Sequence, residues 1–555
     1  MSIKKELVFC PLGGAGEIGM NLYLYGYGAN GDYEWIIVDI GVTFTDESVP
    51  GVEVILPDIS FIKERKKKLL GIFLTHAHED HVGAISHLWG DLNCNIYATP
   101  FTAEVVKEKF REKKINISNF LKIVELDGNV KVGPFNIDYV TLTHSILEPS
   151  GLLLRFNEHT VFHTADWKVD ENPLIGEKIN EKKLIEIGNE GVHTMICDST
   201  NVFNVGSSGS EKLVRTSLYD VLEKMKNRVV ITAFASNVAR METVFKCAEK
   251  SGRLVSLVGR SMSRIYNIAK HCGYLSDVHP PIDVRDTKKV PKNKLVYLCT
   301  GSQGEQRAAL ARIASNTHPD VRLDEGDNVI FSSRIIPGNE KKLFKLFNEF
   351  SKRKINVLSE ENSMIHVSGH PGREDLKKMY NWIKPKILIP VHGEDRHLSE
   401  HVVYAKECGI EQSIKVINGE LLRIFPNKTE IIDRIPVGKV YLDGHVLLND
   451  SSTTIKDRKK IAFNGFLNVS IQMAKNGNIK NNPIINLLGV PFIDEEVHQA
   501  QYDLEDIIFK TSKTFSLNNL KQEKNFIEQI KINCRKYIND RVGKKPVVLV
   551  NLLRS

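Results

Sequence analysis

Residues 71–81 read Gly-Ile-Phe-Leu-Thr-His-Ala-His-Glu-Asp-His, an apolar run that changes at once into a row of imidazoles and carboxylates. The apolar residues predict a short buried strand, and the polar residues form the loop that follows it. Neutral imidazole and carboxylate groups are good ligands for zinc and similar divalent ions. The predicted metal ligands on this loop are His76, His78, Asp80 and His81.

Three more candidate ligands lie far along the chain, and each of them follows an apolar strand. His144 comes after NIDYVTLT, Asp166 after HTVFHTA, and His392 after ILIPV. Four ligands on one short loop cannot all close around one ion, so we expect these strand ends to meet the loop at one edge of a β-sandwich. Because one carboxylate can bridge two cations about 3.5–4 Å apart, Asp166 would complete a two-metal site.

The pattern of predicted strands and helices changes twice along the chain. Up to about residue 200 it consists of short apolar or alternating strands bounded by Gly, Asn or Asp. From about Ser210, helical patterns such as SEKLVRTSLYDVLEKMK alternate with buried strands such as RVVITAF, which predicts βα units around a parallel sheet. Past Ile424 strands return, and a helix-rich basic tail ends in the strand-like PVVLVNLL.

Composition excludes several classes of protein. The chain has 555 residues, of which 42% are hydrophobic and 26% charged, unlike a disordered, collagen-like or disulfide-scaffold chain. No apolar run approaches the roughly 18 residues that span a bilayer, and the apolar stretch near the N-terminus is too short for a signal peptide. The eight cysteines occur singly, without a CxxC pair. We therefore expect a cytoplasmic protein with no membrane partner.

The positive charge is concentrated near the C-terminus. Between Lys510 and Lys545 there are ten Lys and Arg against three Asp and Glu, an excess equal to the net charge of +7 of the whole chain. Residues 518–540 also space apolar side chains along one helical face. The basic segment suits a polyanionic partner, although a solvated helix face explains the charge equally well.

A glycine-rich motif near the N-terminus imitates a dinucleotide fingerprint. Gly14, Gly16 and Gly19 follow an apparent strand, and Asp39 lies twenty residues further on. A true fingerprint must open a helix. Here the glycines lead into Asn21-Leu-Tyr-Leu-Tyr-Gly, which alternates like a strand. We therefore predict a turn between two strands.

The ligand motifs resemble those of the metallo-β-lactamase superfamily, and the long stretch between Asp166 and His392 resembles the domain that β-CASP nucleases insert there. CDSTN (197–201), HVSGH (366–370) and PVHGE (390–394) look like the three added motifs of those nucleases. The match narrows to the ribonuclease J family, whose signatures are similar, in order, to GGAGEIGMN, HTADWK, DSTN, FASN, CTGSQGE, SSRIIPGNE, HVSGHPGREDL, PVHGE and IPVGKVYLDG.

This resemblance implies the fold and its domains. The fold is of the α/β class: a metallo-β-lactamase αββα sandwich with an inserted β-CASP α/β domain and a smaller α+β C-terminal domain. The first part of the sandwich is expected at 1–208, the insert at 209–365, and the rest of the sandwich with a linker at 366–445. Residues 450–555 would form the C-terminal domain, which serves oligomerisation and RNA contact.

The resemblance also implies a metal-dependent ribonuclease. Such an enzyme is both a 5′→3′ exonuclease and an endonuclease of mRNA turnover and rRNA processing, and it leaves 5′-phosphate and 3′-hydroxyl ends. One ion is assigned to His76, His78, His144 and Asp166, and the other to Asp80, His81, Asp166 and His392. Zinc is the ion that the ligands favour, with Mn²⁺ or Mg²⁺ as alternatives. Asp80 and His370 are the expected catalytic residues, and His370 is the candidate general acid.

Further residues are assigned through the same resemblance. The partner is single-stranded RNA with a 5′-monophosphate end, and the assembly is a homodimer or homotetramer. Asp198 belongs to the first added motif, and Asp443 is the candidate ligand of a structural calcium ion. The residues expected to bind the 5′-phosphate are Ser236, Asn237, His366, Val367, Ser368, Gly369 and His370.

Two other functions remain open at this point. The chain could be a metallo-hydrolase of a small thioester or lactam, against which the length of the insert and the basic tail both argue. It could also be a catalytically inactive RNA-binding scaffold, against which the complete ligand set argues. Assays on RNA and on a chromogenic small substrate, with metal analysis, separate the three functions.

Overall fold

The computed structural model describes residues 5–29, 31–45, 49–156, 159–426, 428–474, 478–515 and 520–554. They form two compact units. The first consists of residues 1–43 and 56–438, and the second of residues 44–55 and 439–555.

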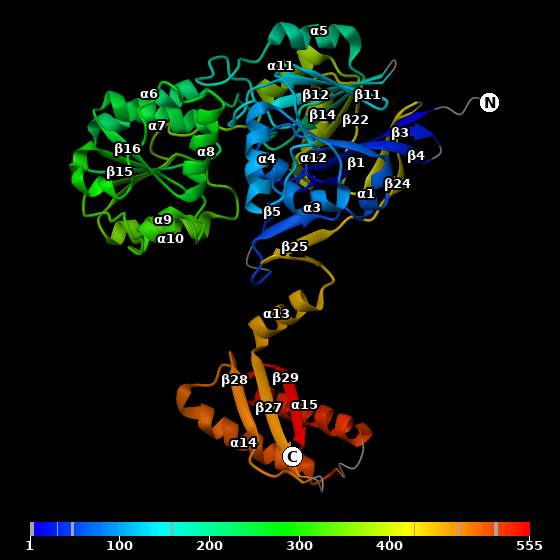
Figure 1. Cartoon of the computed structure of the whole chain (residues 1–555), viewed down its shortest axis with the longest axis vertical. Coiled ribbons are helices and arrows are strands. Elements are labelled where there is room, and N and C mark those ends of the chain that lie inside the picture. Colours follow the sequence, from blue (N-terminus) through cyan, green and yellow to red (C-terminus); the bar gives the residue numbers. More distant parts are fainter. Residues whose placement is uncertain are drawn as a thin grey trace. The chain divides into compact units, whose positions relative to one another are not determined.

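Two large β-sheets face each other in the first unit (Figure 1). The eight-stranded sheet has the order β24 (Glu430–Arg434), β23 (Glu420–Phe425), β1 (Glu6–Gly13), β3 (Leu22–Ala29), β4 (Asp32–Val38), β7 (Leu69–Phe73), β8 (Ile96–Ala98), β9 (Leu121–Ile123). The seven-stranded sheet has the order β10 (Asn129–Val132), β11 (Phe135–Thr141), β12 (Ser150–Phe156), β13 (His159–His163), β14 (Thr194–Asp198), β20 (Ile387–Val391), β22 (Gln412–Ser413). Apolar side chains of both sheets, such as Phe9 and Leu152, pack into one core between them.

Helices cover the outer faces of this sandwich. The far side of the seven-stranded sheet packs against α5 (Glu181–Gly191), α11 (Arg373–Ile383) and α12 (Asp395–Glu407). The eight-stranded sheet carries α1 (Ser60–Glu64), α3 (Ile85–Leu92) and α4 (Pro100–Glu112), and the short α2 (Glu79–Val82) precedes α3. This layering confirms the predicted αββα sandwich.

A second α/β layer is inserted between β14 and β20. Its five strands are all parallel, in the order β16 (Leu254–Val258), β17 (Leu295–Cys299), β15 (Val229–Thr232), β18 (Asn328–Phe331), β19 (Asn356–Leu358). One face packs against α6 (Glu211–Lys224), α7 (Val238–Lys250) and α8 (Arg260–His271), and the other against α9 (Ala309–Ala314) and α10 (Glu340–Lys352) (Figure 1). The βα units predicted from about Ser210 are confirmed.

The core of the insert continues into the sandwich. Its apolar cluster includes Phe101 and Val105 of α4, Ile146 and Leu147, and also Ala77. Because Ala77 stands between two predicted metal ligands, the ligand loop belongs to the same apolar cluster as the insert.

The second unit contains two small sheets, apart from the first residue of β5 and the last two residues of β6. One has the order β26 (Val446–Asn449), β25 (Lys439–Asp443), β6 (Val54–Pro57), β5 (Thr43–Phe44), and the other the order β28 (Ile484–Leu488), β27 (Phe466–Met473), β29 (Val547–Arg554). The helices are α13 (Thr453–Asn464), α14 (Asp494–Ser512) and α15 (Leu520–Val542). Phe526, Ile530, Cys534 and Ile538 of α15 are fully buried against the second sheet. The predicted apolar helical face is thereby confirmed, while residues 518–519 lie outside the described chain.

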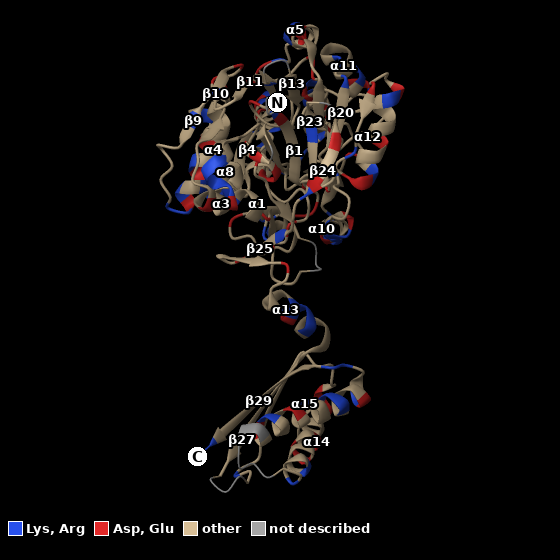
Figure 2. Ribbon diagram, turned by 90° about the vertical axis from the view of Figure 1, so that its right-hand side faces the viewer, with Lys and Arg blue, Asp and Glu red and all other residues tan. Residues whose placement is uncertain are grey.

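The predicted basic segment falls mainly on α15 and the end of α14. Figure 2 shows basic and acidic residues interspersed on these helices. Several cations have close acidic neighbours, such as Lys510 with Asp506 at 2.5 Å and Lys531 with Glu528 at 2.6 Å. Part of the positive excess is therefore neutralised locally.

The glycine-rich motif near the N-terminus forms a turn between strands. The glycine motif joins β1 to β3 through the two-residue strand β2 (Ala15–Gly16), which pairs with β21 (Gly393–Glu394), and it opens no helix. This confirms the predicted turn between strands.

All eight cysteines are free thiols. Within the described chain, no helix has both the length and the apolar character to cross a membrane.

Candidate metal centre

The predicted ligands come from the ends of four strands that meet at one edge of the sandwich. His76 and His78 lie on the loop after β7, whereas Asp80 and His81, predicted on the same loop, lie on the short helix α2 that follows it. His144 follows β11, Asp166 follows β13, and His392 follows β20. The structure gathers their ligand atoms into two overlapping groups, in each of which all atoms lie within 4.8 Å of one another. The first group is His76, His78, His144 and Asp166, and the second is Asp80, His81, Asp166 and His392.

The first group has three imidazoles around one corner. His78 Nδ1 lies 3.1 Å from both His76 Nε2 and His144 Nε2. Asp166 Oδ2 lies 3.8 Å from His76 Nε2 and 3.7 Å from His144 Nε2. Three ring nitrogens and one carboxylate oxygen thus converge on one point.

The second group shares the same carboxylate oxygen. Asp166 Oδ2 is 3.2 Å from His81 Nε2 and 3.5 Å from His392 Nε2. Asp80 Oδ2 is 3.8 Å from His81 Nε2 and 3.6 Å from His392 Nε2. Asp166 therefore stands between the two groups, where a carboxylate can bridge two ions.

The donor set fits divalent metal ions. Asp166 Oδ1 is buried and has no hydrogen-bond partner in the described part of the chain, which is costly for a carboxylate unless a cation completes its surroundings. Burial lowers the pKa of His78 to about 4 and holds the pKa values of His76 and His144 well below their usual range. These imidazoles are neutral at neutral pH, which is the form that binds metal.

Electrostatics keep Asp166 ionised despite its burial. Burial opposes ionisation, but His392, His81 and His370 outweigh it and hold the pKa of Asp166 well below its usual range. The shared ligand is therefore a carboxylate.

Buried groups behind the histidines select which ring nitrogen faces the centre. His81 Nδ1–H donates to Asp39 Oδ2 at 2.7 Å, and His144 Nδ1–H donates to the carbonyl oxygen of Gly369 at 2.5 Å. Thr75 Oγ1 donates to Asp39 and accepts from His76 Nδ1–H at 3.0 Å. Because each Nδ1 is committed to these partners, Nε2 is left for a metal ion.

Sequence reasoning missed this role of Asp39. It noted Asp39 only as the acid of the rejected dinucleotide fingerprint. In the structure, backbone strain marks Asp39 as part of the metal centre, because Asp39, Ala165 and His392 have φ values of 59°, 51° and 52°. Residues other than glycine avoid this left-handed region, and when they adopt it they cluster at functional sites.

His370 belongs to neither group, but it forms a third group of close polar atoms with Asp198, Asp166 and His392. Its Nδ1 is 2.8 Å from Asp198 Oδ2 and 3.8 Å from Asp166 Oδ2. Burial disfavours the imidazolium, but Asp198, Asp166 and Asp80 outweigh it and raise the pKa of His370 to about 9. Before ions bind, a protonated imidazole therefore lies at the rim of the centre. The contact between Asp198 and His370 also connects the first and second added motifs.

The second added motif is held by hydrogen bonds from the first. Asn201 Nδ2 donates to Ser368 Oγ at 2.6 Å and to the carbonyl oxygen of His370 at 3.0 Å. A Cβ at Gly369 would lie 2.7 Å from His144 Cε1, so only glycine fits there. Val367 is buried. Gly369, predicted to bind the 5′-phosphate, thus packs against the predicted metal ligand His144.

The other predicted phosphate-binding residues lie at the start of α7 and before β20. Ser236 precedes the N-cap residue Asn237, whose Oδ1 accepts from Arg240 N and whose Nδ2 donates to Glu211 Oε1. Burial and Arg240 lower the pKa of His366 to about 3, and Arg334 contributes to this shift. His366 is therefore neutral, and sequence reasoning overlooked the exposed Arg334 near it.

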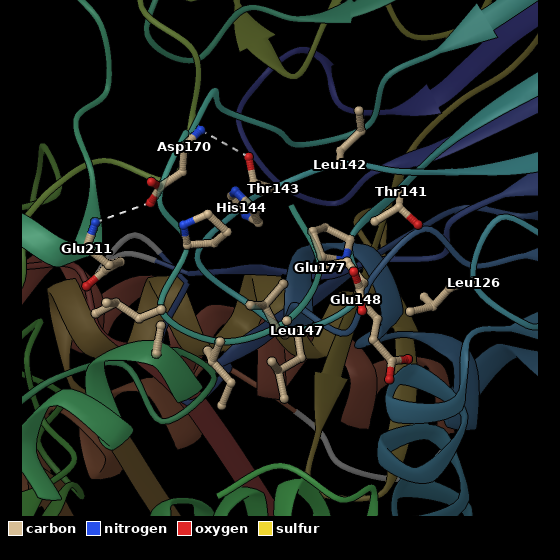
Figure 3. A pocket seen from close by; sticks show the side chains of 17 residues that line it. Leu126, Thr141, Leu142, Thr143, His144, Leu147, Glu148, Asp170, Glu177 and Glu211 are labelled. Carbon is tan, nitrogen blue, oxygen red and sulfur yellow. Dashed lines mark hydrogen bonds between the residues drawn. The ribbon is translucent and has the colours of Figure 1, made fainter. Parts of the chain in front are cut away.

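A small cavity of about 30 Å³ adjoins the first group (Figure 3). His144 and Thr143 line it together with the acids Asp170 and Glu211. These acids already have partners, because Asp170 accepts from the backbone N–H of Glu211, and Glu211 pairs with Arg240 at 3.0 Å. The cavity therefore reflects packing beside His144.

Asp443 stands apart from these clusters. It lies in β25 of the second unit and pairs with Arg458 at 2.6 Å. In the described chain, no group of three potential metal ligands includes Asp443.

Comparison with known proteins covers nearly the whole chain. Four family models match: "Beta-lactamase superfamily domain" at residues 34–189, "Ribonuclease J, beta-CASP domain" at 226–350, "Zn-dependent metallo-hydrolase RNA specificity domain" at 354–416, and "Ribonuclease J C-terminal domain" at 453–555.

Relatives match over nearly the whole of this chain and over most of their own length. Ribonuclease J of Sinorhizobium meliloti is 40% identical over 99% of this chain and 98% of the relative. Ribonuclease J of Helicobacter pylori strain J99 is 32% identical over 99% of this chain and 79% of the relative, and ribonuclease J2 of Bacillus subtilis is 29% identical over 97% of both chains. The solved structure of a protein of unknown function from Enterococcus faecalis V583 covers 75% of this chain and 100% of its own, with a TM-score of 0.51 and 18% identity, a likeness that shows the fold alone. Similarity along both full lengths, together with the domain order, means that this chain belongs to the ribonuclease J family of metallo-β-lactamase-fold hydrolases.

Proposed function

We propose that the protein is a metal-dependent ribonuclease that acts as both a 5′→3′ exonuclease and an endonuclease and leaves 5′-phosphate products. One observation carries the proposal: two ligand groups share Asp166, and His370 is held against Asp198 beside them. When bound, two divalent ions would supply the positive charge that activates water and neutralises phosphate oxygens. The residues that would hold them are His76, His78, His144 and Asp166 for one ion, and Asp80, His81, Asp166 and His392 for the other.

The protein itself supplies the proton for the leaving group. Hydrolysis that leaves a 5′-phosphate releases the 3′-oxygen of the upstream nucleotide, which must gain a proton. His370 Nδ1 is fixed by Asp198, and Nε2 is left to donate to that oxygen. Neighbouring carboxylates raise its pKa to about 9 before ions bind, and Asp198, which holds Nδ1, continues to favour the protonated form once they do.

Donors suited to a 5′-monophosphate lie next to His370 and at the start of α7. Ser368 Oγ accepts from Asn201 Nδ2 and from the backbone N–H of His370, so its own hydrogen can donate to a phosphate oxygen. Ser236 stands at the N-terminal end of α7, where backbone N–H groups favour an anion. The amide of Asn237 is engaged in the N-cap and with Glu211, so we assign it the support of this turn.

Several finer features belong to the same proposal. Zinc is the preferred ion because imidazoles dominate the ligand set, with Mn²⁺ or Mg²⁺ as alternatives. The substrate is single-stranded RNA in mRNA turnover and rRNA processing, and the second unit serves RNA contact and a homodimer or homotetramer. The eight free thiols agree with a cytoplasmic location. Calcium binding at Asp443 would require Arg458 to leave its carboxylate.

Labelled RNA tests the proposal. The full-length protein, loaded in turn with Zn²⁺, Mn²⁺ or Mg²⁺, is incubated with 5′-labelled and 3′-labelled RNA that carries a 5′-monophosphate or a 5′-triphosphate. We expect mononucleotides from the 5′ end, faster release from monophosphate ends, and internal cuts with 5′-phosphates. Equal rates on both ends would contradict the phosphate pocket. Cleavage of a chromogenic thioester or lactam in place of RNA would overturn the proposal, as would RNA binding without cleavage.

A further inference from the structure

The glycine-rich turn between β1 and β3 ends in Asn21, whose side chain is fully buried and is not used by the proposed chemistry. We infer that Asn21 is a positioning residue that sets the affinity of the second ligand group for its ion and leaves the first group unaffected. The inference rests on the two-ion site proposed above. It gives a specific purpose to the GGAGEIGMN motif, to which the proposed function assigns none.

The amide oxygen of Asn21 fixes His392. Oδ1 accepts from His392 Nδ1–H at 2.9 Å and from the hydroxyl of Tyr23 at 2.7 Å. Because Nδ1 carries the hydrogen, His392 Nε2 is the nitrogen that faces the Asp80 and Asp166 carboxylates. The hydroxyl of Tyr23 in turn fixes which end of the amide is the acceptor.

The amide nitrogen of Asn21 reaches the other two ligands of this group. Nδ2 donates to the backbone oxygen of Asp80 at 3.1 Å and lies 3.0 Å from His81 Nε2. The backbone N–H of Asn21 donates to the same Asp80 oxygen at 2.9 Å. One side chain thus holds two of the three ligands that the second group does not share, His392 and Asp80, and lies against His81 Nε2, the nitrogen that an ion would take.

The first group depends on other partners. Among the described hydrogen bonds, none joins Asn21 to His76, His78 or His144. His76 Nδ1 is held instead by Thr75, whose hydroxyl also donates to Asp39, the partner of His81. A substitution confined to the first group is therefore made at His144.

The glycines of the turn make room for this amide. A Cβ at Gly14 would lie 2.3 Å from Asn21 Oδ1 and 2.5 Å from the Tyr23 hydroxyl oxygen. The carbonyl oxygen of Gly14 also accepts the backbone N–H of His392 at 2.6 Å, where His392 adopts its strained φ of 52°. Turn and amide therefore hold the same ligand from its backbone and from its ring.

Metal binding, rather than catalysis, tests this role. Metal-depleted full-length protein is titrated with Zn²⁺ by calorimetry, and bound zinc is counted by elemental analysis. For the unsubstituted protein we expect two binding events. Asn21→Ala should weaken one event by about 10- to 100-fold, the usual effect of losing a partner behind a ligand, and leave the other unchanged.

Three controls separate this role from a general packing role. His144→Ala, which removes a ligand of the first group alone, should abolish one event and leave the other, and combining it with Asn21→Ala should also weaken the remaining event. In a His392→Ala background, Asn21→Ala should cause little further loss, because the two residues act through one ligand. Tyr23→Phe, which removes one hydroxyl and keeps the ring, should weaken the same event as Asn21→Ala by a smaller factor.

The outcomes distinguish this inference from the proposed function. A single zinc event in the unsubstituted protein would refute the two-ion site itself. If the unsubstituted protein shows two events, two results would overturn the role of Asn21 alone. Either Asn21→Ala and Tyr23→Phe leave both events unchanged, or each variant weakens the two events equally. If Asn21→Ala fails to fold by circular dichroism, the Tyr23→Phe titration decides the matter.

Discussion

The metal edge of the sandwich and the basic C-terminal segment both concentrate charge, but they hold it differently. At the metal edge Asp166 and His81 are almost completely buried, and their atoms meet within 3.2 Å. In the C-terminal segment Lys510 is exposed and pairs with an acid one turn away. Burying charge is costly without partners, whereas exposed pairs contribute about 0–1 kcal/mol.

This difference shows which charges identify function. A buried cluster with an unpartnered carboxylate oxygen requires an explanation, and a metal ion provides it. A row of exposed cations is explained by solvation as well as by RNA. The predictions below test this contrast, beginning at the metal edge.

Asp80→Ala should abolish RNA cleavage while the fold remains, because it removes a ligand of the second group and with it the activated water. Cleavage of 5′-labelled RNA at limiting Zn²⁺ measures the loss. Glu79→Ala is the matched control: Glu79 neighbours Asp80 but points to Lys109, and its loss should leave cleavage nearly unchanged. Normal cleavage by Asp80→Ala would contradict the two-ion site.

His370→Ala should lower the single-turnover cleavage rate by about 10²- to 10⁴-fold, the range for a general acid, with little change in RNA binding. Asp198→Asn should lower the rate less, because it loses only the group that orients His370. The exposed His279→Ala serves as the control. Weaker RNA binding with an unchanged rate would show that His370 only contacts the substrate.

The seven candidate ligands could be named from the sequence because each stands near the end of a recognisable apolar strand and has a side chain of a metal-binding type, and the structure brings them together. Asn21, Thr75 and Asp39 could not be predicted in the same way, since their roles depend on which groups lie across the sheet. Asn237 shows the opposite case. Its motif suggested a phosphate contact, yet its amide bonds to the backbone in the N-cap of α7 and to Glu211. These partners compete with a phosphate for the amide, and only the tertiary structure reveals them.

Glu211→Gln should destabilise the insert by about 3–5 kcal/mol at neutral pH, because it leaves the buried Arg240 guanidinium without its carboxylate. Burial opposes ionisation of Glu211, but Arg240 and Lys168 hold its pKa below the usual 4.5. A depressed pKa stabilises the fold above about pH 4.5, and this contribution disappears as the pH falls through the folded-state pKa.

Thermal unfolding at pH 7 and at pH 4 measures this effect, and the gap between variant and unsubstituted protein should narrow in acid. Glu112→Gln is the control, because Glu112 pairs with Arg264 at the surface and its loss should cost about 0–1 kcal/mol. A gap that stays constant with pH would show that lost packing, not lost charge, destabilises the variant.

The smallest effect is expected at the basic segment, where Arg541, Lys544 and Lys545 precede β29. Arg541 already lies 3.5 Å from Asp503, and Lys544 lies 3.7 Å from the centre of the Phe463 ring. Neutralising all three should weaken RNA binding equally across sequences. The slope of log affinity against log salt should flatten by at most about two, because each phosphate contact with a single strand contributes about 0.7.

Fluorescence anisotropy over a salt series measures this slope in the full-length protein. Neutralising Arg285, Lys288 and Lys289, which lie on the insert beside Asp283 and Asp286, removes the same charge and controls for long-range attraction. If the two triple variants change the slope equally, the C-terminal cations act only through net charge. If only the C-terminal variant changes the slope, those cations contact phosphates. The exposed charges of this segment then have a function, although they are not buried as the charges at the metal edge are.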